Sequence, residues 1–148
     1  MPRLSRVAVL WDSTIGDVQF RAAVAVGRAA GLGVQSLPIQ RPGDFKNVFD
    51  RAVREQSHGV IVLSSPLINE QRSQIATLAL KTRLPTISLF TSFPQSGTLM
   101  AYGPNLQELY QRAPSYVAKI LEGAKPSELP IERPTKFELV INRASRES

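Results

Sequence analysis

Polar and aromatic side chains follow three short apolar runs of the sequence, at residues 7–10, 60–63 and 86–90. These side chains are Trp11, Asp12, Ser13 and Thr14 after the first run, Ser64 and Ser65 after the second, and Phe90 and Phe93 at the end of the third and just beyond it. An aspartate can pair with an ammonium group, and an aromatic ring can stack on a ring or a cation. Free amides at a helix start near Thr14 can hold an anion. The set predicts contacts to a small molecule.

Each of these residues also has a structural interpretation that the sequence leaves open. Thr14 can be a helix cap, and Asp12 can form an Asx turn. Trp11 can be a core residue, and the two serines can simply finish a strand. Their common position after apolar runs is what favours the binding interpretation for the set.

Residue types and motifs exclude most catalytic classes. The chain has no Cys and a single His, so thiol catalysis, disulfides and multi-His metal sites are ruled out. It contains neither a GxSxG nucleophile motif nor a Walker loop. His58 precedes Gly59 at an expected helix end, where it can interact with the last carbonyls. We therefore predict no catalytic residues, no metal site, no cofactor and no enzymatic activity.

Strand and helix patterns alternate along the chain. Strands are expected at 7–10, 34–39, 60–63, 86–90, 99–102 and 137–141, and helices at 14–30, 44–58, 69–82 and 105–122. The first helix is expected to begin at a capping box formed by Thr14 and Asp17. Pro114 is expected to kink the last helix. Residues 124–136 contain several prolines and are expected to form an extended connector.

This order predicts an α/β fold, a Rossmann-like three-layer α/β/α sandwich with a parallel sheet. We expect a single lobe over residues 1–142 and a polar tail over 143–148. In such a sheet, ligands bind beyond the carboxyl ends of the strands, where the loops that carry the candidate residues lie.

The composition limits the class of partner. The 148 residues carry 18 Lys and Arg against 12 Asp and Glu, a formal charge of +6, and 43% are hydrophobic. The positive charge is spread along the chain without a basic, aromatic-lined stripe, so nucleic acid is not an expected partner. The first residues lack a signal-peptide pattern. If the 148 residues are the whole gene product, we expect a cytoplasmic location.

Four segments resemble one family of bacterial substrate-binding proteins that serve ABC-type importers, including proteins assigned to tryptophan and tyrosine uptake. The segments are RVAVLWD at 6–12, LMAYGPNLQELY at 99–110, YVAKILEGAKP at 116–126 and PTKFELVIN at 134–142. The resemblance implies one lobe, the second, of a type I periplasmic-binding-protein fold. It further implies a non-catalytic role for a small organic ligand such as an amino acid, an ABC permease as partner and a periplasmic location.

Two further expectations depend on this resemblance. Without the first lobe, ligand affinity should be weak. The apolar stripe of residues 105–122 should either fold back on its own sheet or form a homodimer with a second copy, which we favour. Two other classes remain open at this point: a cytoplasmic ligand-sensing effector domain of a lac-repressor-like regulator, and an enzyme of the doubly wound class.

Overall fold

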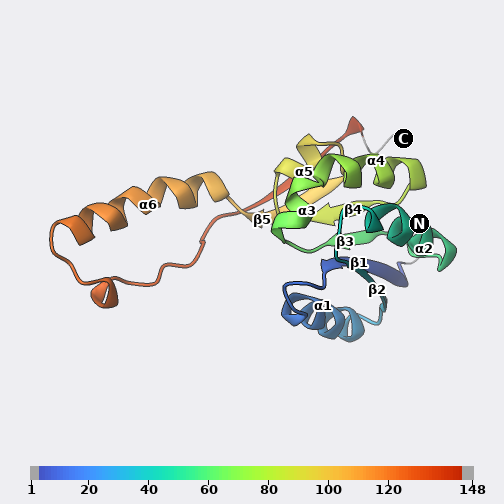
Figure 1. The fold of residues 1–148 in the computed structure, drawn as a ribbon, viewed down its shortest axis with the longest axis horizontal. Helices are drawn as coiled ribbons and strands as arrows, with labels where there is room; N and C mark the ends of the chain where they lie inside the picture. Colours follow the sequence, from blue (N-terminus) through green and yellow to red (C-terminus); the bar gives the residue numbers. More distant parts are fainter. Residues whose placement is uncertain (1–3, 145–148) are drawn as a thin grey trace.

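The computed structural model describes residues 4–144, so residues 1–3 and 145–148, the latter part of the expected polar tail, lie outside the described residues. A six-stranded sheet has the order β2-β1-β3-β4-β5-β6 (Figure 1). Its strands are β1 (Arg6–Asp12), β2 (Gly33–Ile39), β3 (Val60–Val62), β4 (Thr86–Ser88), β5 (Met100–Pro104) and β6 (Phe137–Ile141). The α/β prediction is confirmed.

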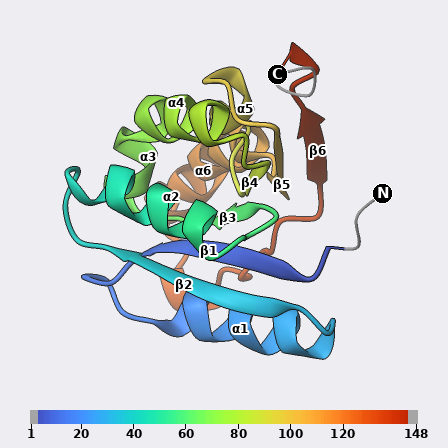
Figure 2. The same cartoon turned by 90° about the vertical axis from the view of Figure 1, so that its right-hand side faces the viewer.

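Helices cover both faces of the sheet, but unequally. On one face lie α2 (Asp44–Arg54), α3 (Pro66–Glu70), α4 (Arg72–Thr82) and α5 (Ser92–Gln95). On the other face, α1 (Val18–Ala29) lies alone beneath β1 and β2 (Figure 2). The layered sandwich is therefore complete only over part of the sheet.

The main core lies between the sheet and the α2–α5 layer. Its β1 and β3 members, Ala8, Leu10, Val60 and Val62, are all buried, as expected for strands with continuous apolar runs. From α2, the helical spacing brings Phe45, Val48, Phe49 and Ala52 to the same core. These four residues form the inner face of α2.

Three local expectations need correction. The first helix begins at Val18, and Asp17 at its N-cap makes no side-chain capping bond, so the predicted capping box does not form. The expected helix at 69–82 is two helices, α3 and α4, because Ser65 caps an earlier turn at Pro66. Residues 92–95, where no helix was expected, form the short helix α5.

The direction of β6 also differs from the expected parallel sheet. Strands β1 to β5 are parallel, whereas β6 pairs antiparallel with β5. The reason is the route of the chain, which leaves the sheet after Pro104 and returns at the same end, where the Asn105 amide donates to the Lys136 carbonyl at 3.2 Å. A strand that starts where its neighbour ends must run back along it.

The segment between β5 and β6 forms an arm that projects from the sheet (Figure 1). It consists of α6 (Leu106–Leu121), the 3-10 helix η1 (Pro126–Glu128) and an extended return to Phe137. The helix runs continuously through Pro114 and has no buried residue. The helix therefore does not fold back on its own sheet.

Candidate functional site

Asp12 is the centre of the polar groups at the carboxyl end of β1. Its side chain is buried, with 5% of the residue exposed. One carboxylate oxygen, Oδ1, accepts a hydrogen bond from the Thr14 amide at 2.9 Å and a second from the Thr14 hydroxyl at 2.6 Å. This is the Asx-turn arrangement that the sequence left open. The Thr14 amide is consequently occupied and does not offer the free anion site expected there.

The charge state of Asp12 follows from two opposing influences. Burial is the largest single influence and raises its pKa. Hydrogen bonds from the Thr14 hydroxyl, the Thr14 amide and the Ser65 hydroxyl favour the charged form, and together they hold the pKa of Asp12 below its ordinary value of 3.8. Asp12 is therefore an ionised carboxylate at neutral pH, and within residues 4–144 it forms no ion pair.

Ser65 links this carboxylate to the neighbouring loop. It is 3% exposed and comes three residues after the end of β3, the strand next to β1. Its Oγ also accepts a hydrogen bond from the Ile68 amide at 3.1 Å and so caps α3. The structure thus brings Asp12, Thr14 and Ser65 together, as the topological argument predicted.

A hollow of about 80 Å³ opens beside these groups. Its lining combines the ends of β1 and β3 with the start of α1: Trp11, Asp12, Ile15, Gly16, Val18, Gln19, Phe20, Leu63 and Ser64. A water molecule occupies about 30 Å³ in the liquid, whereas pockets for whole small ligands measure about 300–1,000 Å³. The hollow is large enough for one functional group of a ligand only.

The aromatic wall of the hollow comes from Trp11 and Phe20. Their rings stack with centroids 4.8 Å apart and planes 9° from parallel. The indole N–H of Trp11 donates to Ser36 Oγ at 2.9 Å, so its polar atom is already used within the protein. Trp11 therefore offers the hollow an apolar ring surface.

Gln19 is a lining residue that sequence reasoning missed. Its amide nitrogen donates to the Ser64 carbonyl, and its amide oxygen accepts from the Ser64 backbone N–H, both at 3.3 Å. These two bonds tie the first turn of α1 to the loop after β3. The only sequence signal was its position near the expected start of a helix, because the two partners are 45 residues apart.

The remaining predicted residues lie away from the hollow. The Ser13 hydroxyl donates to the Ile39 carbonyl at 3.3 Å, toward β2. Phe93 is 2% exposed and belongs to the main core, and Phe90 packs against that core. Neither phenylalanine is among the residues that line the hollow.

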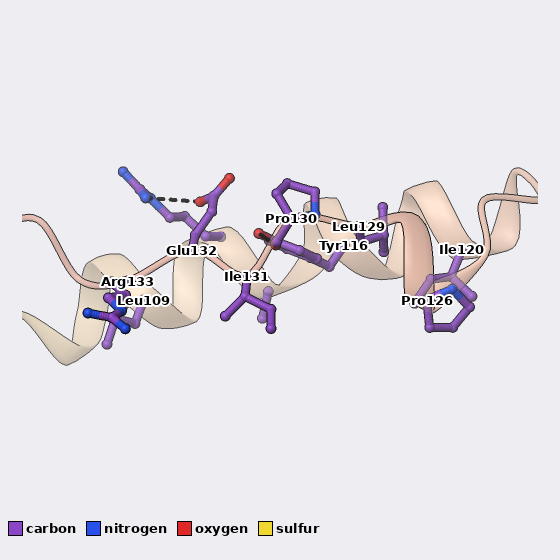
Figure 3. Close-up of a pocket in the computed structure, with 11 residues that line it drawn as sticks. Leu109, Tyr116, Ile120, Pro126, Leu129, Pro130, Ile131, Glu132 and Arg133 are labelled. Atoms are coloured by element: carbon purple, nitrogen blue, oxygen red, sulfur yellow. Dashed lines mark hydrogen bonds and ion pairs between the residues drawn. The ribbon is translucent and has the colours of Figure 1, made fainter.

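A larger groove of about 450 Å³ lies in the arm, between α6 and the returning chain (Figure 3). Leu109, Tyr116 and Ile120 line it from the helix, opposite Leu129 and Ile131. The Tyr116 hydroxyl donates to the Pro130 carbonyl at 2.9 Å, which holds the return against the helix. This groove is built from the arm alone and shares no residue with the hollow at Asp12.

Comparison with known proteins identifies the family. The sequence profile of the ABC transporter substrate binding proteins matches residues 1–148, the whole chain. The chain belongs to this family. A search of curated proteins found no match.

Solved structures of similar proteins share the fold of this substrate-binding family member. A conserved domain protein from Vibrio cholerae matches with a TM-score of 0.88 and 19% identity over 99% of this chain and 50% of its own. An ABC domain from Streptococcus pneumoniae in complex with L-Trp matches at 0.86, with 17% identity, over 99% and 51%.

A third structure, the ligand-free, open form of a substrate-binding protein with adhesive properties from Clostridium difficile, matches at 0.75 with 18% identity over 99% and 50%. The chain therefore spans about half the length of these proteins. Their fold, a periplasmic-binding-protein-like α/β domain, agrees with the expected class.

Two negative findings apply to the described residues of this family member. No helix between residues 4 and 144 combines the length and apolar character needed to cross a membrane. Over the same residues, His, Asp and Glu side chains nowhere gather in a group that could hold a metal ion.

Proposed function

We propose that this chain is a solute-binding lobe of an ABC-type importer and that it holds an amino acid without catalysis. The family match supports an importer component over the effector domain of a regulator. The single observation that carries the ligand class is Asp12, an ionised and buried carboxylate without an ion pair in the described chain. Such a group binds a cation strongly because little water screens it.

The neighbouring groups fit the rest of an amino acid. In the proposal, the ligand ammonium lies against the Asp12 carboxylate, and the apolar ring surface of Trp11 and Phe20 receives part of the side chain. Ser64 borders the same hollow and offers a hydroxyl. Of the residues predicted from the sequence, the proposed contacts are Trp11, Asp12 and Ser64, with Gln19 added. Thr14 and Ser65 support the Asp12 carboxylate, whereas Ser13, Phe90 and Phe93 lie away from the hollow and are not among the proposed contacts.

The size of the hollow supports a shared ligand site. A cavity of about 80 Å³ holds one end of an amino acid, so a second surface must enclose the remainder. The matched structures are about twice as long as this chain. We propose that a second lobe supplies this surface and that the assembled protein delivers its ligand to an ABC permease. Since members of this family typically work in the periplasm or outside the cell, the proposed location is periplasmic.

Isothermal titration calorimetry with a panel of amino acids and their decarboxylated and deaminated analogues tests the ligand class. We expect amino acids and amines to release heat of binding and the deaminated acids to release none, because only the former pair with Asp12. Asp12→Asn should abolish the binding. Asp50→Asn is the matched control, since Asp50 is a half-exposed surface partner of Lys46 far along α2. Equal binding of the deaminated acids would contradict the proposal.

The arm supports a second proposal, a homodimer through residues 105–122. The apolar stripe of α6 divides into two adjacent faces: Leu109, Tyr116 and Ile120 line the groove of the arm, whereas Leu106, Tyr110, Val117 and Leu121 are 36–82% exposed. Burying such a side chain contributes about 1.5–3 kcal/mol, so the exposed face favours association. A second copy is the proposed partner.

Light scattering at high micromolar concentration tests this contact. We expect Tyr110→Glu with Leu121→Glu to shift the chain toward lower mass. The control pair is Gln107→Glu with Gln111→Glu, which adds the same charge to polar positions of the same helix. An unchanged mass in the first variant would contradict a dimer through α6.

A further inference from the structure

The outer edge of β6 carries backbone groups that no other strand within residues 4–144 uses. β6 is the last strand of the sheet, and in the part of the chain that the structure describes it pairs only with β5 (Figure 2). At its two ends, the Asn142 amide donates to the Leu99 carbonyl at 2.8 Å, and the Lys136 carbonyl accepts from the Asn105 amide at 3.2 Å. In an antiparallel pair, only every second residue bonds to a given neighbour. The bonds of β6 to β5 therefore belong to the even-numbered residues.

It follows that Phe137, Leu139 and Ile141 direct their N–H and C=O groups away from β5, toward the free edge. The same three residues expose 52%, 59% and 50% of their surfaces. Phe137 also stacks with Tyr102 of β5 at a centroid distance of 6.0 Å, which places both rings on one face of the sheet. This is the face on which α1 covers only β1 and β2.

Edge strands of native sheets are normally protected by proline, bulges or charged side chains. β6 has the sequence FELVI, with no proline, and its pairing with β5 is regular from Phe137 to Ile141. Its single charged residue, Glu138, lies on the opposite face from Phe137 and accepts a hydrogen bond from the Asn105 side chain at 2.7 Å. Among residues 4–144, nothing therefore blocks this edge from pairing with another strand.

We propose that this edge is a self-association surface, at which β6 of one chain pairs antiparallel with β6 of a second copy. A two-fold axis at Leu139 sets Leu139 opposite its own copy and Phe137 opposite Ile141 of the partner. Every outward N–H and C=O of these three residues then meets a complementary group. The apolar side chains also meet as cross-strand pairs on the same face.

The charges along β6 suit this register. Lys136 lies opposite Asn142, Glu138 opposite Val140 and Arg143 opposite Thr135, so no like charges face each other directly. Antiparallel pairing also sends the two arms to opposite ends of the joined sheet, since each arm leaves from the Phe137 end of its own strand. β6 of a second copy can therefore pair with this edge without any change in the backbone of either strand.

Hydrogen exchange and sedimentation of the Tyr110→Glu, Leu121→Glu chain test the edge apart from any contact through α6. Because the native chain would use both contacts and form a larger assembly, we expect this variant to be a dimer at high micromolar concentration. The amides of Phe137, Leu139 and Ile141 should exchange more slowly as concentration rises. The amides of Glu138 and Val140 should be protected at every concentration. A monomer under these conditions, or exchange at the three edge amides that does not depend on concentration, would overturn the proposal.

Two variants separate backbone pairing from side-chain burial. Leu139→Pro removes the central outward N–H at a residue that makes no bond to β5, and it should weaken the dimer by about 100-fold. Leu139→Ala keeps this N–H and should weaken the dimer by about 10-fold. A dimer that tolerates the proline as well as the alanine would contradict strand pairing. If the proline variant unfolds, the exchange of the unaltered edge decides the question.

Discussion

Thr14 donates two hydrogen bonds to the same oxygen of Asp12, from its amide at 2.9 Å and from its hydroxyl at 2.6 Å. With Ser65, these bonds keep a buried carboxylate ionised in the loop after β1. The proposed binding role of Asp12 depends on this charge, since a protonated carboxyl could not pair with an ammonium group.

Thr14→Val should raise the pKa of Asp12, because it removes the hydroxyl donor and leaves the burial that opposes ionisation. In the native chain the lowered pKa stabilises the folded state above pH 3.8, and this stabilisation is lost as the pH falls through the folded-state pKa. In the variant, the folded-state pKa lies closer to the unfolded value, so this stabilisation should be smaller and its loss should be complete at a higher pH. Carbon-detected NMR titration of Asp12 gives the pKa, with Thr77→Val on exposed α4 as control. A pKa equal to that of the native chain would show that the hydroxyl bond has no effect.

Ser65→Ala should lower the free energy of unfolding by about 1–2 kcal/mol, because it removes the cap of α3 and one hydrogen bond to Asp12 together. Urea denaturation followed by circular dichroism measures this change. Ser115→Ala is the matched control, since the exposed Ser115 hydroxyl bonds only within α6. Equal midpoints for the two variants would contradict the structural role of Ser65.

Gly103→Ala should lower the free energy of unfolding by about 1–3 kcal/mol. A Cβ at this position collides with the backbone carbonyl of Leu89, the residue directly after the neighbouring strand β4. Gly43→Ala is the control, because Gly43 has helical dihedral angles and open space around its Cβ position. Thermal unfolding of both variants checks the difference. A Gly103→Ala chain as stable as Gly43→Ala would mean that the Leu89 carbonyl moves away at little cost.

The isolated 148-residue chain should bind amino acids with dissociation constants weaker than about 1 µM. The hollow at Asp12 encloses only part of such a ligand, so most of the apolar surface of the ligand stays in water. Calorimetry of the isolated chain measures the affinity directly. Sub-micromolar binding would show that one lobe suffices.

Local sequence patterns correctly predicted the strands and helices whose formation depends on the spacing of nearby apolar residues. The apolar run at 7–10 became the buried part of β1, and the spacing of Phe45, Val48 and Phe49 became the inner face of α2. Both depend on the repeat of apolar residues along a short segment, which a single sequence displays. The positions of Asp12 and Ser65 at neighbouring strand ends followed from the strand order alone.

The partners of individual side chains depended on contacts between distant segments. Gln19 meets Ser64 across 45 residues, and Asn105 meets Glu138 across 33. No local pattern specifies such pairs, so the sequence missed the role of Gln19, and the tertiary structure placed Phe93 in the core.

The sequence by itself determined the α/β class, the absence of thiol chemistry and the location of the candidate loops, because these follow from residue types and short-range periodicity. Tertiary structure decided that β6 runs antiparallel, that the returning chain covers only one face of the α6 stripe, and that Thr14 binds Asp12 instead of capping α1. The physical reason is that each of these features depends on the path of the chain between two distant segments. A polar side chain can form hydrogen bonds with several kinds of partner, and an apolar side chain can pack against several surfaces, so only the folded chain determines which contact forms.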